Sequence, residues 1–164
     1  MMAVIKPFLS WYVAADYFEA WKYTPFLIVG CVYLTMGTFM STSYTVHKDS
    51  MGFLLSGTFG AVLNIILNFA LIPVIGVYGA ALATCVSYIA VFVFRFFHTR
   101  KYIKYSIFTK EFIFGTVFLI GSGILMFSNN VLCQCLQILI AIIALVFFQN
   151  VWLLFAKEVF RKFR

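Results

Sequence analysis

Three long stretches of the chain contain no Asp, Glu, Lys or Arg: residues 23–46, 50–94 and 112–156. A helix needs about 20 apolar residues to cross the hydrocarbon core of a bilayer. The second and third stretches each have 45 residues, so each has room for two crossing helices and a turn. We place these turns at Pro73–Gly76 and at residues 128–130. The chain is therefore predicted to be an all-α, polytopic membrane helix bundle with about five transmembrane helices, at residues 24–46, 52–72, 77–97, 111–128 and 131–155.

Composition agrees with this fold class. The chain is 64% hydrophobic and only 10% charged, whereas soluble domains carry about 25% charged residues. No polar stretch is long enough to form a soluble domain. Residues 1–23 are rich in aromatic side chains suited to a membrane interface, Trp11 and Trp21 among them. We predict that they form an interfacial segment or the tail of a missing span, and that residues 156–164 form a basic tail.

Basic residues separate by side when five spans are threaded through a membrane. Ten fall on one side: nine in the 46–51 loop, the 97–111 loop and the carboxy-terminal tail, and Arg95 at the adjoining end of the third span. The other two, Lys6 and Lys22, fall on the opposite side. The positive-inside rule then predicts a cytoplasmic carboxy terminus and an external amino terminus. We interpret the net charge of +7 as a consequence of this topology. We also expect it to attract the chain's basic side to anionic membrane lipid. No nucleic-acid partner is expected, since the basic residues flank spans.

A stripe of small and polar residues runs along the second predicted span. Asn64 and Asn68 are four residues apart and share a helix face, which continues to Gly60 and Ser56. In lipid such a stripe must face protein or a water-filled cavity. The two asparagines are candidates for lining a substrate cavity or, alternatively, for joining helices by hydrogen bonds. The small residues expected at helix contacts are Gly60, Gly79, Ala80, Ala83 and Thr84.

Two further sets of polar residues have more than one interpretation. Thr35, Thr38 and Thr42 recur at helical spacing and could line the same cavity or bond back to their own helix. Arg95, near the end of the third span, could extend to the membrane surface or contact a lipid phosphate. Arg100 and Lys101 in the following loop allow the same two interpretations. His47 and His98 each stand alone in sequence, so we expect no metal site from them.

The segment from Asn64 to Tyr88 resembles the carboxy-terminal lobe of O-antigen-type polysaccharide flippases, in the multidrug/oligosaccharidyl-lipid/polysaccharide exporter superfamily. The resemblance rests on Asn64-Ile-Ile-Leu-Asn68, Leu71-Ile-Pro73, Gly76-Val-Tyr-Gly79-Ala-Ala-Leu-Ala83-Thr84 and Ser87-Tyr88. It implies a partial lobe of an exporter fold with 12–14 spans in the bacterial inner membrane. It also implies that a missing amino-terminal lobe or partner chain completes the transport pathway.

The function implied by this resemblance is membrane transport of a lipid-linked oligosaccharide for polysaccharide or lipopolysaccharide biosynthesis. One alternative is the multidrug-exporter branch, which often uses acidic residues inside its spans, and this chain has none at a span centre. Another is a polysaccharide polymerase or ligase, but the predicted external turns are short. We expect no catalytic residue, cofactor or metal, because the five acidic residues are scattered along span boundaries.

Overall fold

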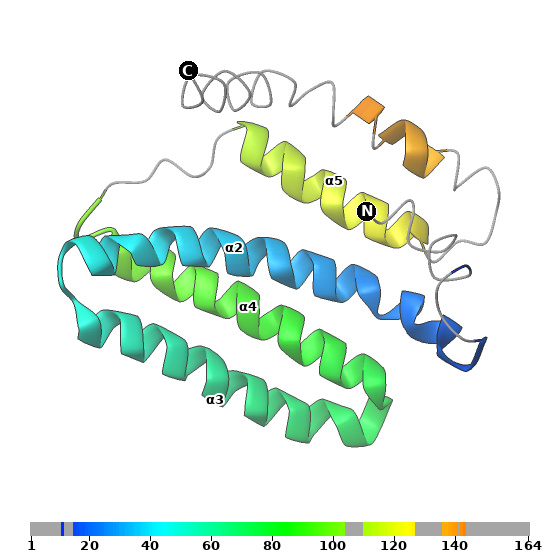
Figure 1. Ribbon diagram of the computed structural model, residues 1–164, viewed down its shortest axis with the longest axis horizontal. Helices are drawn as coiled ribbons and strands as arrows, with labels where there is room; N and C mark the ends of the chain where they lie inside the picture. The colour runs from blue at the N-terminus through cyan, green and yellow to red at the C-terminus, as the bar shows by residue number, and fades with distance from the viewer. Residues whose placement is uncertain (1–10, 12–14, 104–109, 127–135, 141, 144–164) are drawn as a thin grey trace.

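The computed structural model describes residues 11, 15–103, 110–126, 136–140 and 142–143. A short 3-10 helix, η1 (Ala15–Lys22), precedes the four α-helices α2 (Thr24–Val46), α3 (Ser50–Ile75), α4 (Val77–Thr99) and α5 (Lys110–Met126) (Figure 1). No strand occurs in these residues, which confirms the all-α class. The helices α2, α3 and α4 are each long and apolar enough to cross a membrane. The chain is thus a membrane protein built around a helix bundle.

The bounds of the first three long helices are close to the predicted spans, with one correction at the α3–α4 turn. α2 coincides with residues 24–46, whereas α3 runs through Pro73 to Ile75 instead of ending at residue 72. Pro73 stands in the last turn, where its missing N–H removes one bond near the helix end. Gly76 alone separates α3 from α4, with φ of 58° and ψ of −134°, a backbone conformation that only glycine enters readily.

The remaining predicted segments differ more from the structure or lie beyond its described part. α5 has 17 residues and overlaps the predicted span at 111–128, but it is too short to count among the candidate spans. The predicted span at 131–155 lies outside the described residues except for helical residues 136–140 and 142–143. The basic tail at 156–164 also lies outside them.

The aromatic segment before α2 is divided between surface and core. Trp11 is exposed, whereas Trp21 is buried against Met126 of α5. Partly buried Ile28, Val29 and Leu119 pack around this pair. Trp21 thus joins η1 and α2 to the end of α5, because a large ring gains much from apolar contact. The interfacial role of residues 1–23 stays a prediction.

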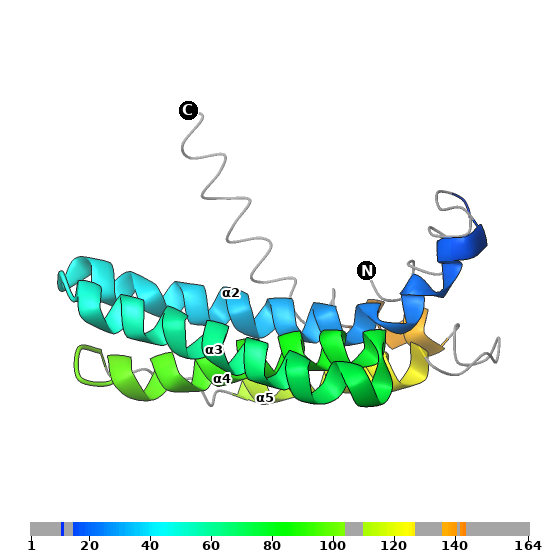
Figure 2. The same ribbon diagram turned by 90° about the horizontal axis from the view of Figure 1, so that it is seen from below.

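α4 packs against both α2 and α3 and lies between them in Figure 1. The helices align along one direction (Figures 1 and 2). α2 and α4 run parallel with a constant offset of 55 residues between contacting partners. Tyr23 meets Tyr78 with ring centroids 4.7 Å apart. Two glycines continue this register at seven-residue steps, Gly30 against Cys85 and Gly37 against Phe92. Such a period keeps one seam of each helix in contact along its length.

α3 and α4 run antiparallel, and their contacting residues step by four. Ser56 meets Arg95, Gly60 meets Val91, and Gly79 meets the backbone of Leu71 and Ile72. In an antiparallel pair, the residue numbers of contacting partners have a constant sum. This sum is 151 for the first two pairs, so both belong to one register of the α3–α4 hairpin. The stripe predicted from Asn64 and Asn68 thus belongs to the face of α3 that meets α4.

The Gly60 contact leads to a stability prediction. A Cβ at this position would collide with Cγ2 of Val91, and a valine on a helix has one strongly preferred rotamer. We expect Gly60→Ala to lower the free energy of unfolding by about 1–3 kcal/mol, measured by denaturant titration in mixed micelles.

Gly57 provides the matched control on the same helix. A Cβ there meets nothing within 4 Å, so Gly57→Ala should be neutral or stabilise by up to about 1 kcal/mol through helix propensity. Equal losses of stability in the two variants would contradict the proposed packing of α3 on α4.

Candidate functional site

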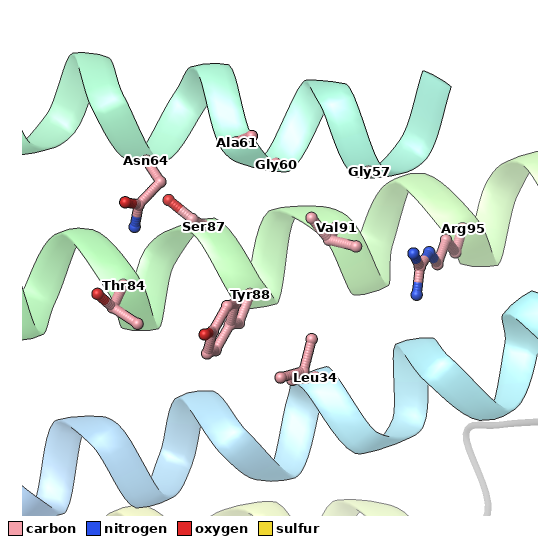
Figure 3. Close-up of a pocket in the computed structure, with 10 residues that line it drawn as sticks. All are labelled: Leu34, Gly57, Gly60, Ala61, Asn64, Thr84, Ser87, Tyr88, Val91 and Arg95. Atoms are coloured by element: carbon pink, nitrogen blue, oxygen red, sulfur yellow. The ribbon is translucent and has the colours of Figure 1, made fainter. Parts of the chain in front are cut away.

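A groove with a volume of about 350 Å³ lies over α4 between α3 and α2. Figure 3 shows its walls, and we call it the groove below. The lining residues are Leu34 of α2, Gly57, Gly60, Ala61 and Asn64 of α3, and Thr84, Ser87, Tyr88, Val91 and Arg95 of α4.

Small residues on α3 create this space. Gly57, Gly60 and Ala61 follow one another along the wall, and none of them has a side chain larger than a methyl group. Gly60 brings α3 close to Val91, while the position of Gly57 opens on empty space. Larger side chains on this face would fill the groove and push the helices apart. The small-residue stripe therefore serves both close packing and the formation of a concave wall.

Arg95 lies at one end of the groove and is only 8% exposed. Its Nε donates a hydrogen bond to Ser56 Oγ at 3.1 Å, and its guanidinium carbon lies 5.7 Å from the centroid of the Phe53 ring. The structure shows Arg95 packed among the helices, and its two interpretations from the sequence, extension to the membrane surface and contact with a lipid phosphate, stay predictions. The backbone of Gly37 also approaches its side chain, since a Cβ there would lie 3.8 Å from Arg95 Cδ.

The charge of Arg95 has no acidic counterpart in the part of the chain that the structure describes. The two ion pairs found there join Lys22 to Glu19 and Lys101 to Asp49. A guanidinium held in apolar surroundings without a counter-ion is costly. The same site is therefore favourable for an anion that enters the groove, because two planar donor edges of a guanidinium match phosphate or carboxylate oxygens.

The other end of the groove is polar and neutral. The side chains of Asn64 and Ser87 point toward one another in Figure 3, and Asn64 Oδ1 accepts a hydrogen bond from Asn68 Nδ2 at 2.8 Å. The hydroxyls of Thr84 and Ser87 donate to Ala80 O and Ala83 O. Their oxygens keep acceptor capacity toward the groove. Of the two predicted cavity asparagines, Asn64 lines the groove and Asn68 supports it.

The predicted threonine stripe lies elsewhere. Thr35 and Thr38 are exposed and donate to Cys31 O at 2.8 Å and Leu34 O at 2.9 Å. Thr42 is exposed as well. None of the three lines the groove, so the interpretation that they line a substrate cavity stays a prediction. A hydroxyl that bonds to its own helix needs no polar partner from a cavity.

Of the remaining predicted packing positions, two are closely packed and two are only half-buried. Ala83 is fully buried, and a Cβ at Gly79 would meet the backbone of Leu71 and Ile72. Ala80 and Thr84 are half-buried, joined by the hydroxyl bond of Thr84. Gly30 and Gly37 are not among the packing positions predicted from the sequence, although their seven-residue spacing on one helix could have indicated a contact seam.

A second group of polar side chains, which we call the loop cluster, gathers where α2, α3 and α4 meet. It consists of Tyr44, His47, Asp49, His98, Lys101 and Tyr102. Asp49 caps α3 by accepting from Gly52 N at 2.9 Å. Its second oxygen accepts from Tyr102 Oη at 2.6 Å and from Lys101 Nζ at 3.1 Å. These bonds from Tyr102, Gly52 and Lys101 hold the pKa of Asp49 well below its usual value.

Two residues of the loop cluster, His98 and Lys101, and the neighbouring Arg100 were singled out from the sequence, and each has a contact in the structure. His98 does not stand alone, since its Nδ1 lies 3.0 Å from Tyr44 Oη. Lys101 pairs with Asp49, while Arg100 is exposed and stacks over Phe96, with its guanidinium carbon 4.4 Å from the ring centroid. Among the described residues, no group of three or more His, Cys, Asp or Glu side chains could hold a metal ion. The sequence contained one signal for this cluster that was not used. Aspartate is a favoured capping residue, and Asp49 stands just before the second predicted span.

Comparisons of the chain with protein-family models, curated proteins and solved structures found no match.

The capping carboxylate leads to a prediction of pH dependence. Because the pKa of Asp49 is lowered on folding, its stabilising effect is fully present above the ordinary aspartate value of about 4 and is lost as pH falls below it. We expect Asp49→Asn to be less stable than the unaltered chain at pH 7, with a difference that shrinks as pH is lowered from 4 toward 3. Thermal unfolding in detergent at several pH values measures this.

The exposed pair at the other end of α2 provides the control. Glu19→Gln removes the partner of Lys22 and should change stability little at any of these pH values, since exposed ion pairs contribute little. A stability difference for Asp49→Asn that persists unchanged down to pH 3 would contradict the capping role of the ionised carboxylate.

Proposed function

We propose that the chain forms part of a membrane transporter that moves a lipid-linked oligosaccharide, as the carboxy-terminal lobe of a polysaccharide flippase. The observation that carries the proposal is Arg95, buried in a groove between membrane-spanning helices without a carboxylate partner among the described residues. A substrate with an anionic diphosphate next to an apolar chain supplies the missing counter-ion. The resemblance of residues 64–88 to such flippases supports the same conclusion.

The two ends of the groove match the two chemical parts of such a substrate. Arg95 offers charged donors to phosphate oxygens, whereas Asn64, Thr84 and Ser87 offer neutral hydrogen-bonding groups suited to sugar hydroxyls. Arg95 and Thr84 are eleven residues apart on α4, about 16 Å along its axis. The groove volume of about 350 Å³ is within the range of small-molecule sites, which is enough for the diphosphate and its neighbouring sugar.

The character of the groove favours an anionic substrate over a cationic drug. None of its lining residues is acidic, and its one charged residue is Arg95. We place the loop cluster and the exposed Arg100 at the cytoplasmic face of the bacterial inner membrane, where a lipid diphosphate enters. Arg100 and Lys101 then provide a first electrostatic contact before the headgroup reaches Arg95.

The groove has walls from α2, α3 and α4, and no opposite wall in the described residues. A second lobe or partner chain would complete it, and transport would follow from movement of one lobe against the other. On this proposal the chain alone binds substrate without exporting it. Full complementation of an export-deficient strain by these 164 residues alone would contradict the need for a partner.

The site is tested by binding of a polyprenyl-diphosphate-linked disaccharide to the purified chain in nanodiscs. We expect Arg95→Gln to weaken binding about 10- to 100-fold, since a charge-assisted hydrogen bond contributes roughly 1.5–3 kcal/mol. Arg95→Lys should keep part of the affinity by retaining the charge, but it loses the planar contact.

Arg100→Gln is the matched control, because it removes an arginine that is exposed and outside the groove. It should change affinity less than about threefold, as expected for a screened surface charge. Binding of the uncharged polyprenol as tightly as the diphosphate, or equal effects of the two arginine variants, would contradict the proposed function.

A further inference from the structure

Tyr88 is the only aromatic side chain among the described residues that line the groove. In Figure 3 it extends from α4 toward α2, the helix that carries Leu34. Asn64 and Ser87 face one another on the side of α3 in the same view. An aromatic ring thus stands on one side of the groove, and neutral hydrogen-bonding groups stand on the other.

The backbone of α2 supports the ring of Tyr88. A Cβ at Gly30 would lie 3.3 Å from Cδ2 of Tyr88, so the ring rests against a position that has no side chain. Tyr88 is half-buried, and this leaves part of its side chain open to the groove that it lines. A side chain held in this way loses little conformational freedom when a ligand packs against it.

Tyr88 and Arg95 lie on the same face of α4, seven residues apart. Two helical turns separate them, about 10.5 Å along the helix axis. Thr84 lies one turn beyond Tyr88 and also lines the groove. The order along α4 is therefore a cation, an aromatic ring and a hydroxyl.

We infer that Tyr88 is a specificity-determining residue whose ring packs against the sugar next to the diphosphate. The inference rests on the proposed function and names the sugar-binding side chain of the same groove. A pyranose presents C–H groups with a small positive charge on its ring faces, and the face of an aromatic ring is negative. The hydroxyls around the sugar then meet Asn64 and Ser87 on the other side of the groove.

The surroundings of Tyr88 favour a sugar over the other chemical parts of a lipid-linked substrate. A polyprenyl chain would cover the amide of Asn64 and the hydroxyl groups nearby with hydrocarbon, which is costly for polar groups. A phosphate beside Tyr88 would lie two turns from Arg95, the one charged residue among the described lining residues. A sugar offers both an apolar face for the ring and hydrogen-bonding groups for the opposite side.

Binding of two lipids to the purified chain in nanodiscs tests this role: polyprenyl diphosphate, and the same lipid carrying one glucose. Tyr88→Leu should weaken binding of the glucose-bearing lipid about tenfold, because ring burial and aromatic contact are both lost. It should change binding of the bare diphosphate less than about twofold, since Arg95 still supplies the charge-assisted contact. A merely structural role of Tyr88 would instead weaken binding of both lipids alike.

Two further variants separate the ring from other contributions. Tyr88→Phe keeps the ring and should retain affinity for the glucose-bearing lipid within about threefold, the modest effect of one neutral hydrogen bond. Tyr78→Leu is the matched control, because Tyr78 is a tyrosine of the same helix that packs edge-to-face on Tyr23 outside the groove. It should leave the difference in affinity between the two lipids unchanged. If Tyr88→Leu does not fold, Tyr88→Met removes the ring with a more adaptable side chain, and the same result is expected.

The outcomes distinguish this inference from the proposed function. Equal effects of Tyr88→Leu on the two lipids, or a loss in Tyr88→Phe as large as in Tyr88→Leu, would overturn the inference. The proposed function would still stand if binding of both lipids depended on Arg95. Absence of binding, or binding of both lipids that Arg95→Gln leaves unchanged, would overturn the proposed function and this inference with it.

Discussion

Close approach of α4 to both of its long neighbours is the constraint on which the other features depend. Lipid tails offer no hydrophobic gain for helix association, so helices associate through tight packing and polar contacts. Gly30 and Gly37 allow α2 to reach α4, and Gly60 allows α3 to do the same. A change in either register would move the polar side chains of α4 out of contact with their partners.

The position of Arg95 follows from these two registers. The antiparallel pairing that places Gly60 against Val91 also places Ser56 next to Arg95, one helical turn away. The parallel pairing of α2 with α4 brings Gly37 over the same side chain. The arginine is thus held in the bundle by backbone geometry, and small residues beside it leave the groove open. The same small residues thus determine both the packing of the three helices and the position of the candidate site.

Much of the fold could be predicted from the sequence, because a bilayer imposes a length and a composition on each helix. The charge-free stretches located α2, α3 and α4, and the Asn64–Asn68 stripe identified the face of α3 that meets α4. The end of α3 was less predictable, since proline usually ends or kinks a helix, whereas α3 continues two residues past Pro73 to Ile75 with one backbone hydrogen bond fewer. Local sequence does not show whether a helix ends before a proline or continues past it.

The site was only partly predictable for a related reason. Thr35 and Arg95 are both polar residues within apolar helices, and their sequence context does not separate them. The structure does, because the threonine hydroxyl is satisfied by Cys31 O, four residues earlier in the chain, whereas the guanidinium reaches a partner 39 residues away. The loop cluster joins Tyr44 to His98 across 54 residues. Contacts of this range depend on helix register, which a single sequence does not specify.

The most direct test of the account is the distance between the Arg95 guanidinium and the phosphorus atoms of a lipid diphosphate. Solid-state NMR dephasing between ¹⁵N-labelled arginine side chains and ³¹P can measure it in membranes. The account predicts a short nitrogen–phosphorus contact that is lost in Arg95→Gln and retained in Arg100→Gln. Contact that depends only on Arg100, or none from Arg95 at saturating lipid, would contradict the claim that this groove binds an anionic headgroup.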